Sequence, residues 1–301
     1  MTDRIEGGFC AAATPIGPDG GPDRALLAAH ARALLEEGCH GIALLGTTGE
    51  ANAFGLDERR AILDGLVEDG VEPARLLPGT GVSSPADTAA LTRHAVQAGV
   101  RGVVMLPPFY YEDVTDEGLY RHYADVIERV GDDRLRVVLY HMPRVSGVPL
   151  LQSLMVRLVD AFPGIVVGVK DSHGDEANLR ATMEALPRFG LMAGADPLLL
   201  SVLRMGGAGC ITATSNLAAA DLRIVYDGWD DPARSEEVEA AQARIVAWRE
   251  LTSLHVQLPN VTAMLARRRG DDDWMRVRAP LVSLTEAERG ETWARMEALE
   301  R

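Results

Sequence analysis

Residues 137–171 read VVLYHMPRVSGVPLLQSLMVRLVDAFPGIVVGVKD, and this stretch decides the fold. Two short apolar runs, Val137–His141 and Ile165–Lys170, flank a longer stretch, Leu150–Phe162, whose apolar residues recur every three or four positions. Near-continuous apolar strands are typical of parallel sheets, because helices and other strands bury both of their faces. The pattern therefore predicts a strand, a crossover helix and a second, parallel strand.

The same alternation runs through most of the chain. Eight strands are predicted: Gly8–Ala13, Gly41–Leu45, Leu76–Gly79, Gly102–Leu106, Val137–His141, Ile165–Lys170, Leu191–Gly194 and Gly209–Thr212. The helices predicted between them are Asp23–Glu37, Asp57–Glu68, Pro85–Ala98, Asp116–Val130, Leu150–Phe162, Asn178–Leu186 and Pro197–Met205. Eight such units favour an α/β fold of the (β/α)8 TIM-barrel type, with an open, doubly wound sheet as the alternative.

The chain after the eighth strand has only helical patterns, in Pro232–Leu254, Asn260–Arg269 and Thr285–Leu299. An α/β barrel uses about 250 residues, so 301 residues leave room for an appendage. We predict a catalytic barrel in residues 1–226 and a C-terminal helical extension, 227–301, packed on it.

Composition excludes several classes of partner. The 30 basic and 44 acidic residues give a net charge of −14, which repels nucleic acids and anionic membranes. No apolar run approaches the roughly 18 residues of a membrane span. Cys10, Cys39 and Cys210 are odd in number and form no CxxC pair, which favours a reducing, cytoplasmic location.

One basic residue differs from the rest: Lys170 is a lysine, whereas the other 29 are arginine. A desolvated amine can lose its proton and attack a carbonyl carbon, whereas a guanidinium stays charged and forms no Schiff base. Lys170 also closes an apolar strand, and catalytic groups of barrels project from the carboxyl ends of strands. The alternative is an accident of an arginine-rich composition.

Other strand ends carry polar groups that suit the same chemistry. Thr47 and Thr48 lie between glycines, so backbone amides and hydroxyls can bind a small carboxylate; a plain turn is the alternative. Tyr140 ends the strand before Lys170, and its hydroxyl can move the protons that imine formation requires. Core packing is the alternative for this tyrosine.

Motifs for other chemistries are missing from the sequence. The seven histidines form no HxH or HExxH pattern, so no metal site is predicted. No GxGxxG, Walker A or GxSxG sequence follows a strand, which argues against nucleotide binding and acyl transfer.

Five motifs together resemble one known family, the dihydrodipicolinate synthase / N-acetylneuraminate lyase family. In the order found there, the chain carries Gly46-Thr47-Thr48-Gly49-Glu50, Pro107-Pro108-Phe109-Tyr110, Tyr140-x-x-Pro143, Gly168-x-Lys170-Asp171-Ser172 and Gly206-Gly207-Ala208-Gly209. The resemblance runs from Thr14-Pro15 to the C-terminal helices. It implies a TIM-barrel class I aldolase or lyase that binds pyruvate, or the pyruvyl end of a 2-oxo acid, as an imine without a cofactor. It also implies a homotetramer, assembled as a dimer of dimers.

The resemblance assigns roles residue by residue. It makes Lys170 the Schiff-base nucleophile and Tyr140 the general acid/base. Thr47 and Thr48 would hold the pyruvyl carboxylate and relay protons. Tyr110 would complete the hydroxyl relay, in many members by reaching into a neighbouring subunit's site.

Further positions are implied to line the pocket. Gly194 and Ile211 match positions that contribute backbone groups, and Ser172 and Asp196 match positions that contact the distal part of longer substrates in the lyase branch. Val145 stands two residues after the Tyr-x-x-Pro proline, where the synthases resemble each other in carrying an arginine that binds aspartate semialdehyde.

The valine at position 145 removes a carboxylate clamp, a loss that typically costs several kcal/mol of binding. Arg144 is one residue away, and on an extended segment it points to the other face. His141 replaces the asparagine common in the family and is expected on the strand face opposite Tyr140. The segment Val145–Val148 looks more like that of the sialic acid lyase branch.

The sequence thus predicts a lyase that condenses or cleaves pyruvate with an aldehyde, or dehydrates a 2-oxo-3-deoxy acid, through a Lys170 imine. One alternative is 4-hydroxy-tetrahydrodipicolinate synthase, which joins pyruvate and aspartate semialdehyde in lysine biosynthesis. Another is a catalytically silent protein that binds a 2-oxo acid.

Overall fold

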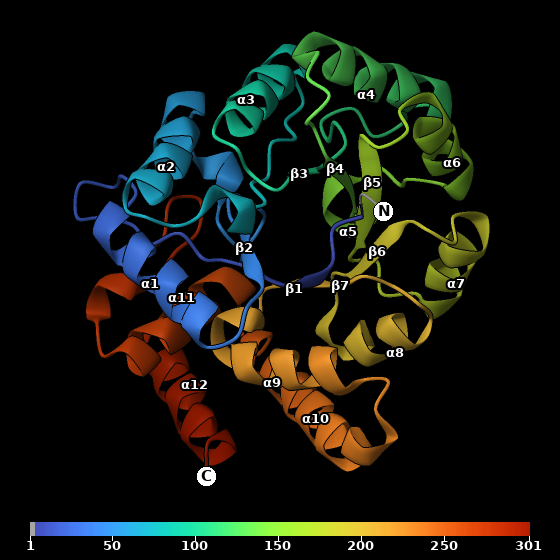
Figure 1. Cartoon of the computed structure of the whole chain (residues 1–301). Helices are drawn as coiled ribbons and strands as arrows, with labels where there is room; N and C mark the ends of the chain where they lie inside the picture. The colour runs from blue at the N-terminus through green and yellow to red at the C-terminus, as the bar shows by residue number, and fades with distance from the viewer. Residues whose placement is uncertain (1–3) are drawn as a thin grey trace.

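A computed structural model describes residues 4–301, in which the strands form a parallel sheet curved into a barrel (Figure 1). The sheet order is β2-β1-β7-β6-β5-β4-β3. The strands are β1 (Gly7–Ala11), β2 (Gly41–Ala43), β3 (Val103–Met105), β4 (Val137–His141), β5 (Val166–Asp171), β6 (Gly190–Ala193) and β7 (Gly209–Thr212). This arrangement confirms the TIM barrel, and the open doubly wound sheet is wrong.

The third predicted strand, Leu76–Gly79, closes the barrel between β2 and β3 through isolated parallel bridges. Leu76 pairs with Ile42 of β2, and Gly79 pairs with Val104 of β3. The Leu77 amide donates to the Ile42 carbonyl at 2.9 Å, and the Val104 amide donates to the Pro78 carbonyl at 3.0 Å. Pro78 has no N–H to donate, so one hydrogen bond toward β3 is missing and the pairing there is not continuous. The prediction of a full strand is wrong there, although the segment has the predicted place.

Helices alternate with the strands and form the outer ring seen in Figure 1. They are α1 (Arg24–Glu36), α2 (Leu56–Glu68), α3 (Pro85–Gln97), α4 (Asp116–Val130), α6 (Gln152–Ala161), α7 (Glu176–Ala185), α8 (Leu199–Arg204) and α9 (Ser215–Gly228), and the short α5 (Pro143–Ser146) lies inside this ring. Side chains of Asp23, Ser84 and Thr115 cap α1, α3 and α4 by accepting from amides in the first turn. The short α5 and the kinked α9 were not predicted.

The core has two layers, because successive residues of a strand point to opposite faces. The inner layer fills the barrel and includes Phe9, Val138, Tyr140, Met192 and Ile211. The outer layer lies between the sheet and the helices. Strand alternation thus turns Tyr140 into the barrel, at the carboxyl end of β4.

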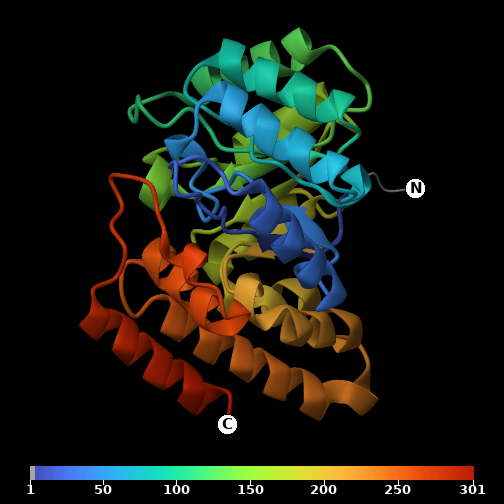
Figure 2. The same ribbon diagram turned by 90° about the vertical axis from the view of Figure 1, so that its left-hand side faces the viewer.

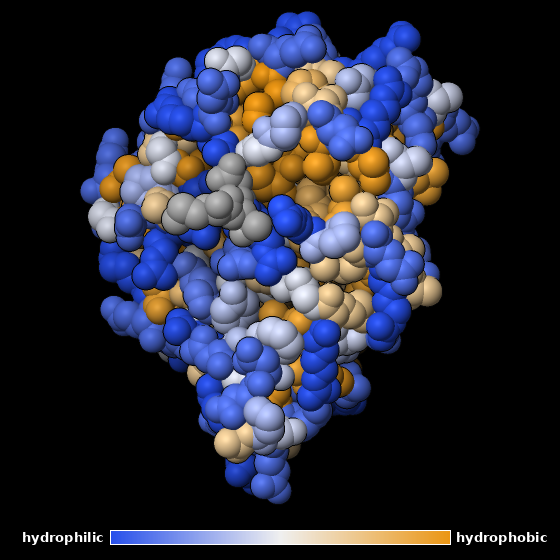
Figure 3. Space-filling model, turned by 45° about the vertical axis from the view of Figure 1, so that its right-hand side comes forward, coloured by the Kyte–Doolittle hydropathy of each residue, from blue (hydrophilic) through white to orange (hydrophobic). Residues whose placement is uncertain are grey.

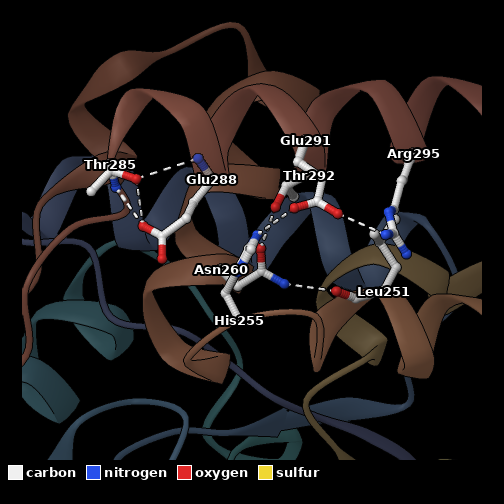
Figure 4. A network of polar contacts seen from close by, with 8 residues as sticks. All are labelled: Leu251, His255, Asn260, Thr285, Glu288, Glu291, Thr292 and Arg295. Carbon is white, nitrogen blue, oxygen red and sulfur yellow. Dashed lines mark hydrogen bonds and ion pairs between the residues drawn. The ribbon is translucent and has the colours of Figure 1, made fainter.

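The C-terminal extension contains α10 (Ser235–Thr252), α11 (Gln257–Arg269) and α12 (Glu286–Leu299), which lie together on one side of the barrel (Figure 2). Buried hydrogen bonds join α12 to the others (Figure 4): the Thr292 hydroxyl donates to Asn260 Oδ1 at 2.8 Å, and Asn260 Nδ2 donates to the Leu251 carbonyl at 2.7 Å. The predicted boundary at 226/227 falls within the last turns of α9, and the division into two parts stays a prediction.

A large cavity lies at the opposite end of the barrel from Tyr140. It measures about 600 Å³ and is lined by residues at or just before the starts of β5 and β6, among them Pro163, Val167, Leu186 and Phe189. Figure 3 shows hydrophobic side chains gathered on this side of the molecule. Within residues 4–301, no helix is both long enough and apolar enough to cross a membrane.

Candidate active site

Tyr140 and Lys170 lie side by side on adjacent strands at the carboxyl end of the barrel. They are register partners in the parallel pairing of β4 with β5. Both side chains are buried, with exposed fractions of 5% and 6%. Lys170 Nζ lies 4.2 Å from the centroid of the Tyr140 ring. Within residues 4–301, no carboxylate forms an ion pair with Lys170, so the amine is not held by a fixed counter-charge.

The surroundings of Tyr140 make its hydroxyl easier to ionise than an ordinary phenol. Burial alone raises the pKa of the phenol, but the Lys170 ammonium and hydrogen bonding from the hydroxyls of Thr47 and Ser172 outweigh it. The net effect lowers the pKa of Tyr140 from its ordinary value. A phenol that gives up its proton more readily suits proton transfer to and from a reacting carbon.

The predicted threonine loop begins and ends with two left-handed residues. Leu45 has φ 55° and Glu50 has φ 53°, a conformation that costs a non-glycine residue free energy. A Cβ at Gly49 would lie 3.0 Å from the Ala12 carbonyl oxygen, so the tight turn also depends on glycine here. Between them, Thr47 is exposed and Thr48 is half-buried. Strain of this kind is typical of functional loops.

The C-terminal extension supports this loop from behind. The Arg278 amide donates to Glu50 Oε2 at 3.1 Å, and the Arg278 guanidinium donates to the Ala53 carbonyl at 2.7 Å and to Glu58 Oε2 at 3.0 Å. Burial raises the pKa of Glu50, while Arg278 opposes that change. The sequence offered no sign of this contact, because more than 200 residues separate the two segments.

Met142 is a site residue that the sequence analysis missed. Its Sδ accepts a hydrogen bond from the Tyr140 hydroxyl at 2.8 Å and lies 3.9 Å from Thr47 Oγ1. Tyr140 and Thr47 also line a small cavity of about 40 Å³, together with Gly46 and Asn52. The thioether therefore lies at both hydroxyls of the predicted relay. The motif Tyr140-x-x-Pro143 leaves this position unspecified, so no pattern identified it.

The next residues of the two strands face outward, as predicted for His141. His141 Nδ1 accepts from the Leu150 amide at 3.0 Å. Asp171 accepts from the His173 amide and from Asn178 Nδ2, each at 2.8 Å. Burial lowers the pKa of His141, Asp171 opposes that shift, and His173 adds to it. This outer cluster anchors the ends of β4 and β5.

Ser172 and Gly194 lie beside this pair. A Cβ at Gly194 would lie 2.0 Å from Ser172 Oγ, and the Gly194 amide donates to the Asp171 carbonyl at 2.7 Å. Only glycine leaves room for the Ser172 hydroxyl, whose hydrogen bonding to Tyr140 contributes to the lowered phenol pKa. Ile211 lies in the inner layer of β7 and is 1% exposed.

Asp196 does not face open space in this structure, since its side chain is buried. Its carbonyl accepts from Gln242 Nε2 at 3.1 Å, and its Oδ2 lies 3.9 Å from Arg249 Nε, both on α10. Burial raises the pKa of Asp196, while Thr212 and Arg249 oppose that shift. The contact with a distal substrate group stays a prediction.

Three other predicted residues lie on the surface. Tyr110 is 76% exposed, and its ring packs edge-on against that of Tyr111, with 5.2 Å between centroids. Val145 is 58% exposed on α5. Arg144 is also exposed, but the extended segment expected there is wrong, because Pro143–Ser146 forms one helical turn. Proline at the first helical position favours that turn.

The described residues include neither a cluster of metal ligands nor an accessible thiol. Residues 4–301 contain no cluster of three or more histidine, cysteine, aspartate or glutamate side chains arranged to hold a metal ion. Cys10, Cys39 and Cys210 are free and buried. Burial raises the pKa of Cys10 and Cys210, which keeps these thiols unreactive.

Comparisons with known proteins point to one family. A model of the dihydrodipicolinate synthetase family matches residues 4–299. A 4-hydroxy-tetrahydrodipicolinate synthase of Rhodospirillum centenum is 34% identical over 80% of this chain and 79% of its own length. YagE of Escherichia coli K12, described provisionally as a 2-dehydro-3-deoxy-D-gluconate aldolase, is 32% identical over 71% of this chain and 70% of its own. The crystal structure of YagE with pyruvate superposes with a TM-score of 0.88 over 98% of each chain, at 25% identity.

Proposed function

This chain belongs to the dihydrodipicolinate synthetase family of pyruvate-dependent lyases and aldolases, and we propose that Lys170 forms the imine with pyruvate or with the pyruvyl end of a 2-oxo acid. The observation that carries the proposal is the pairing of the one lysine with Tyr140 at the carboxyl end of the barrel. Thr47 and Thr48 are the proposed ligands of the pyruvyl carboxylate.

The proposed reaction needs no cofactor, because the protonated imine itself withdraws electrons. The Lys170 amine attacks the keto carbon, and the carbinolamine loses water as Tyr140 supplies a proton to the departing hydroxyl. Loss of a proton from the neighbouring carbon gives an enamine, which attacks an aldehyde and forms a carbon–carbon bond. Hydrolysis then frees the lysine. The reverse sequence cleaves the bond, and elimination of a hydroxyl from the same imine dehydrates a 2-oxo-3-deoxy acid.

The surroundings of α5 favour a second substrate other than aspartate semialdehyde. Val145 cannot bind a carboxylate by an ion pair, and its exposed side chain is uncharged. 4-Hydroxy-tetrahydrodipicolinate synthase activity remains the second candidate, because a relative 34% identical to this chain carries that name. Condensation of pyruvate with aspartate semialdehyde, measured against cleavage of 2-oxo-3-deoxy sugar acids, distinguishes them.

The proposal includes a homotetramer in the cytoplasm. The exposed Tyr110–Tyr111 pair supports an assembly, since two neighbouring aromatic side chains gain by burial against another subunit. Three free cysteines support a reducing compartment. Sedimentation measures the molar mass, and a monomer at working concentration contradicts the tetramer.

Borohydride reduction in the presence of pyruvate, followed by peptide mass spectrometry, tests the proposed function. We expect a reduced adduct on the Lys170 peptide, and a Lys170→Arg variant of unchanged fold should give neither adduct nor turnover. With one lysine in the chain, the amino terminus is the other amine to be assigned. Thermal stabilisation by pyruvate without an adduct would point to a silent 2-oxo acid-binding protein instead.

A further inference from the structure

Met142 contacts both hydroxyls that the proposed reaction uses. Tyr140 donates its hydroxyl proton to Met142 Sδ at 2.8 Å, and Thr47 Oγ1 lies 3.9 Å from the same sulfur. Met142 directly follows β4, where the chain leaves the strand and enters α5. Its sulfur therefore accepts a hydrogen bond from the proton that the phenol must be able to deliver elsewhere during turnover.

Met142 is also partly exposed, whereas five of the nine methionines in residues 4–301 are buried. Met105, Met155, Met192, Met264 and Met296 are buried. Four described methionines are partly exposed: Met142, Met183, Met205 and Met275. Of these four, Met142 is the one that contacts Tyr140. A partly exposed methionine can be oxidised, and at this position oxidation would change the hydrogen bond of the Tyr140 hydroxyl.

We propose that Met142 is a positioning residue that holds the Tyr140 hydroxyl between turnovers, and that its oxidation by a peroxide stops the reaction. This inference rests on the proposed function of Tyr140. It assigns a role to a residue for which neither the motifs nor the comparisons supply one. It also predicts that oxidation of this residue inhibits the enzyme, because its sulfur contacts the Tyr140 hydroxyl.

The chemistry follows from the difference between two acceptors. A thioether sulfur accepts hydrogen bonds weakly, so it keeps the phenol oriented and releases it easily. A peroxide transfers one oxygen atom to the sulfur: the O–O bond breaks, an S–O bond forms, the sulfur loses two electrons, and the peroxide is reduced to water or an alcohol. The resulting sulfoxide oxygen is a much stronger acceptor and retains the phenol proton.

Two substitutions distinguish the role of the Met142 sulfur as a hydrogen-bond acceptor from the role of the side chain's size and shape. Met142→Leu keeps an apolar side chain of similar size but removes the acceptor, whereas Met142→Gln supplies an amide oxygen that resembles the sulfoxide. An acceptor stabilises the protonated phenol, so the midpoint of the pH profile of kcat should move down in the leucine variant and up in the glutamine variant. We also expect kcat to fall about tenfold or more in the glutamine variant, with a smaller change in KM. Equal midpoints in all three proteins overturn the positioning role.

Peroxide treatment tests the modification itself. Wild-type activity should fall in step with the gain of one oxygen on the Met142 peptide, and a methionine sulfoxide reductase should restore it. Met142→Leu should resist the treatment. Met205→Leu, which removes a partly exposed methionine at the end of α8, should lose activity as the wild type does. Inactivation of Met142→Leu at the wild-type rate overturns the proposal.

The two hypotheses fail in different ways. If wild-type protein gives no borohydride adduct with any 2-oxo acid, the proposed function fails. The contact between Tyr140 and Met142 is then still testable by the ultraviolet titration of tyrosinate in wild type and Met142→Leu. If the adduct forms on Lys170 but the variants and the peroxide leave the phenol unchanged, only the role of Met142 fails.

Discussion

Strands β4 and β5 end in two pairs of polar residues that differ in how their polar groups are bound. Tyr140 and Lys170 face into the barrel, and His141 and Asp171, the next residues, face the helices. The outer pair has fixed partners, because backbone amides and Asn178 donate to it. In the inner pair, Tyr140 contacts the Met142 thioether, two neighbouring hydroxyls and Lys170 itself. At the ends of these two strands, the outer pair is therefore bound to fixed hydrogen-bond partners. The inner pair keeps polar groups that a substrate can contact.

Replacing Tyr140 of the inner pair by phenylalanine should have the largest effect of the changes considered, a large loss of kcat with little loss of stability. The ring keeps its packing in the inner layer, while the hydroxyl that moves protons is lost. We expect kcat to fall by about 100- to 10,000-fold, the usual contribution of a general acid or base. Steady-state kinetics measures this, and the melting temperature should change little. A variant with near wild-type kcat would mean that another group moves the protons.

Asp171→Ala should produce the opposite pattern, a loss of stability larger than the loss of chemistry. It leaves the His173 amide and Asn178 Nδ2 without their acceptor. An unpaired buried donor costs about 1–3 kcal/mol, and because these two donors are only partly buried we expect a loss near the lower end, which urea unfolding resolves. Asp133→Ala, at an exposed position, is the matched control and should change stability by less than about 0.5 kcal/mol. Unchanged stability in Asp171→Ala would show that water replaces the carboxylate at no cost.

The inner pair was predictable from the sequence, because strand alternation fixes which way Tyr140 and Lys170 point. The same rule placed His141 on the outer face. Met142 was not predictable, since it lies where the strand ends and alternation no longer determines side-chain direction. The burial of Asp196 depends on Gln242 and Arg249, far along the chain, and no local pattern encodes such a contact.

In the barrel too, some features follow from local sequence patterns and others depend on contacts between residues far apart in the chain. Alternating strand and helix patterns were sufficient to predict its architecture. The sparse pairing of Leu76–Gly79 follows from one proline whose effect on the ladder the apolar pattern does not reveal. The left-handed Leu45 and Glu50 are held by tertiary contacts, including that from Arg278, so propensity alone gives no sign of them.

The smallest expected effect concerns the pH dependence of the outer pair. His141 accepts the Leu150 amide through Nδ1, which favours the neutral imidazole, and burial lowers its pKa against the opposing effect of Asp171. As the pH falls below the ordinary histidine value of about 6.5, the unfolded chain binds a proton at this residue more readily than the folded chain does. This contribution to stability is therefore complete above that value and is lost as the pH falls through the folded pKa.

His141→Asn should flatten the fall in unfolding free energy between pH 7.5 and 5.5, whereas His173→Asn, at an exposed position, should alter it less. An identical slope in wild type and His141→Asn would show that the fold tolerates the protonated ring, and the outer pair would then be less firmly bound than its hydrogen bonds indicate.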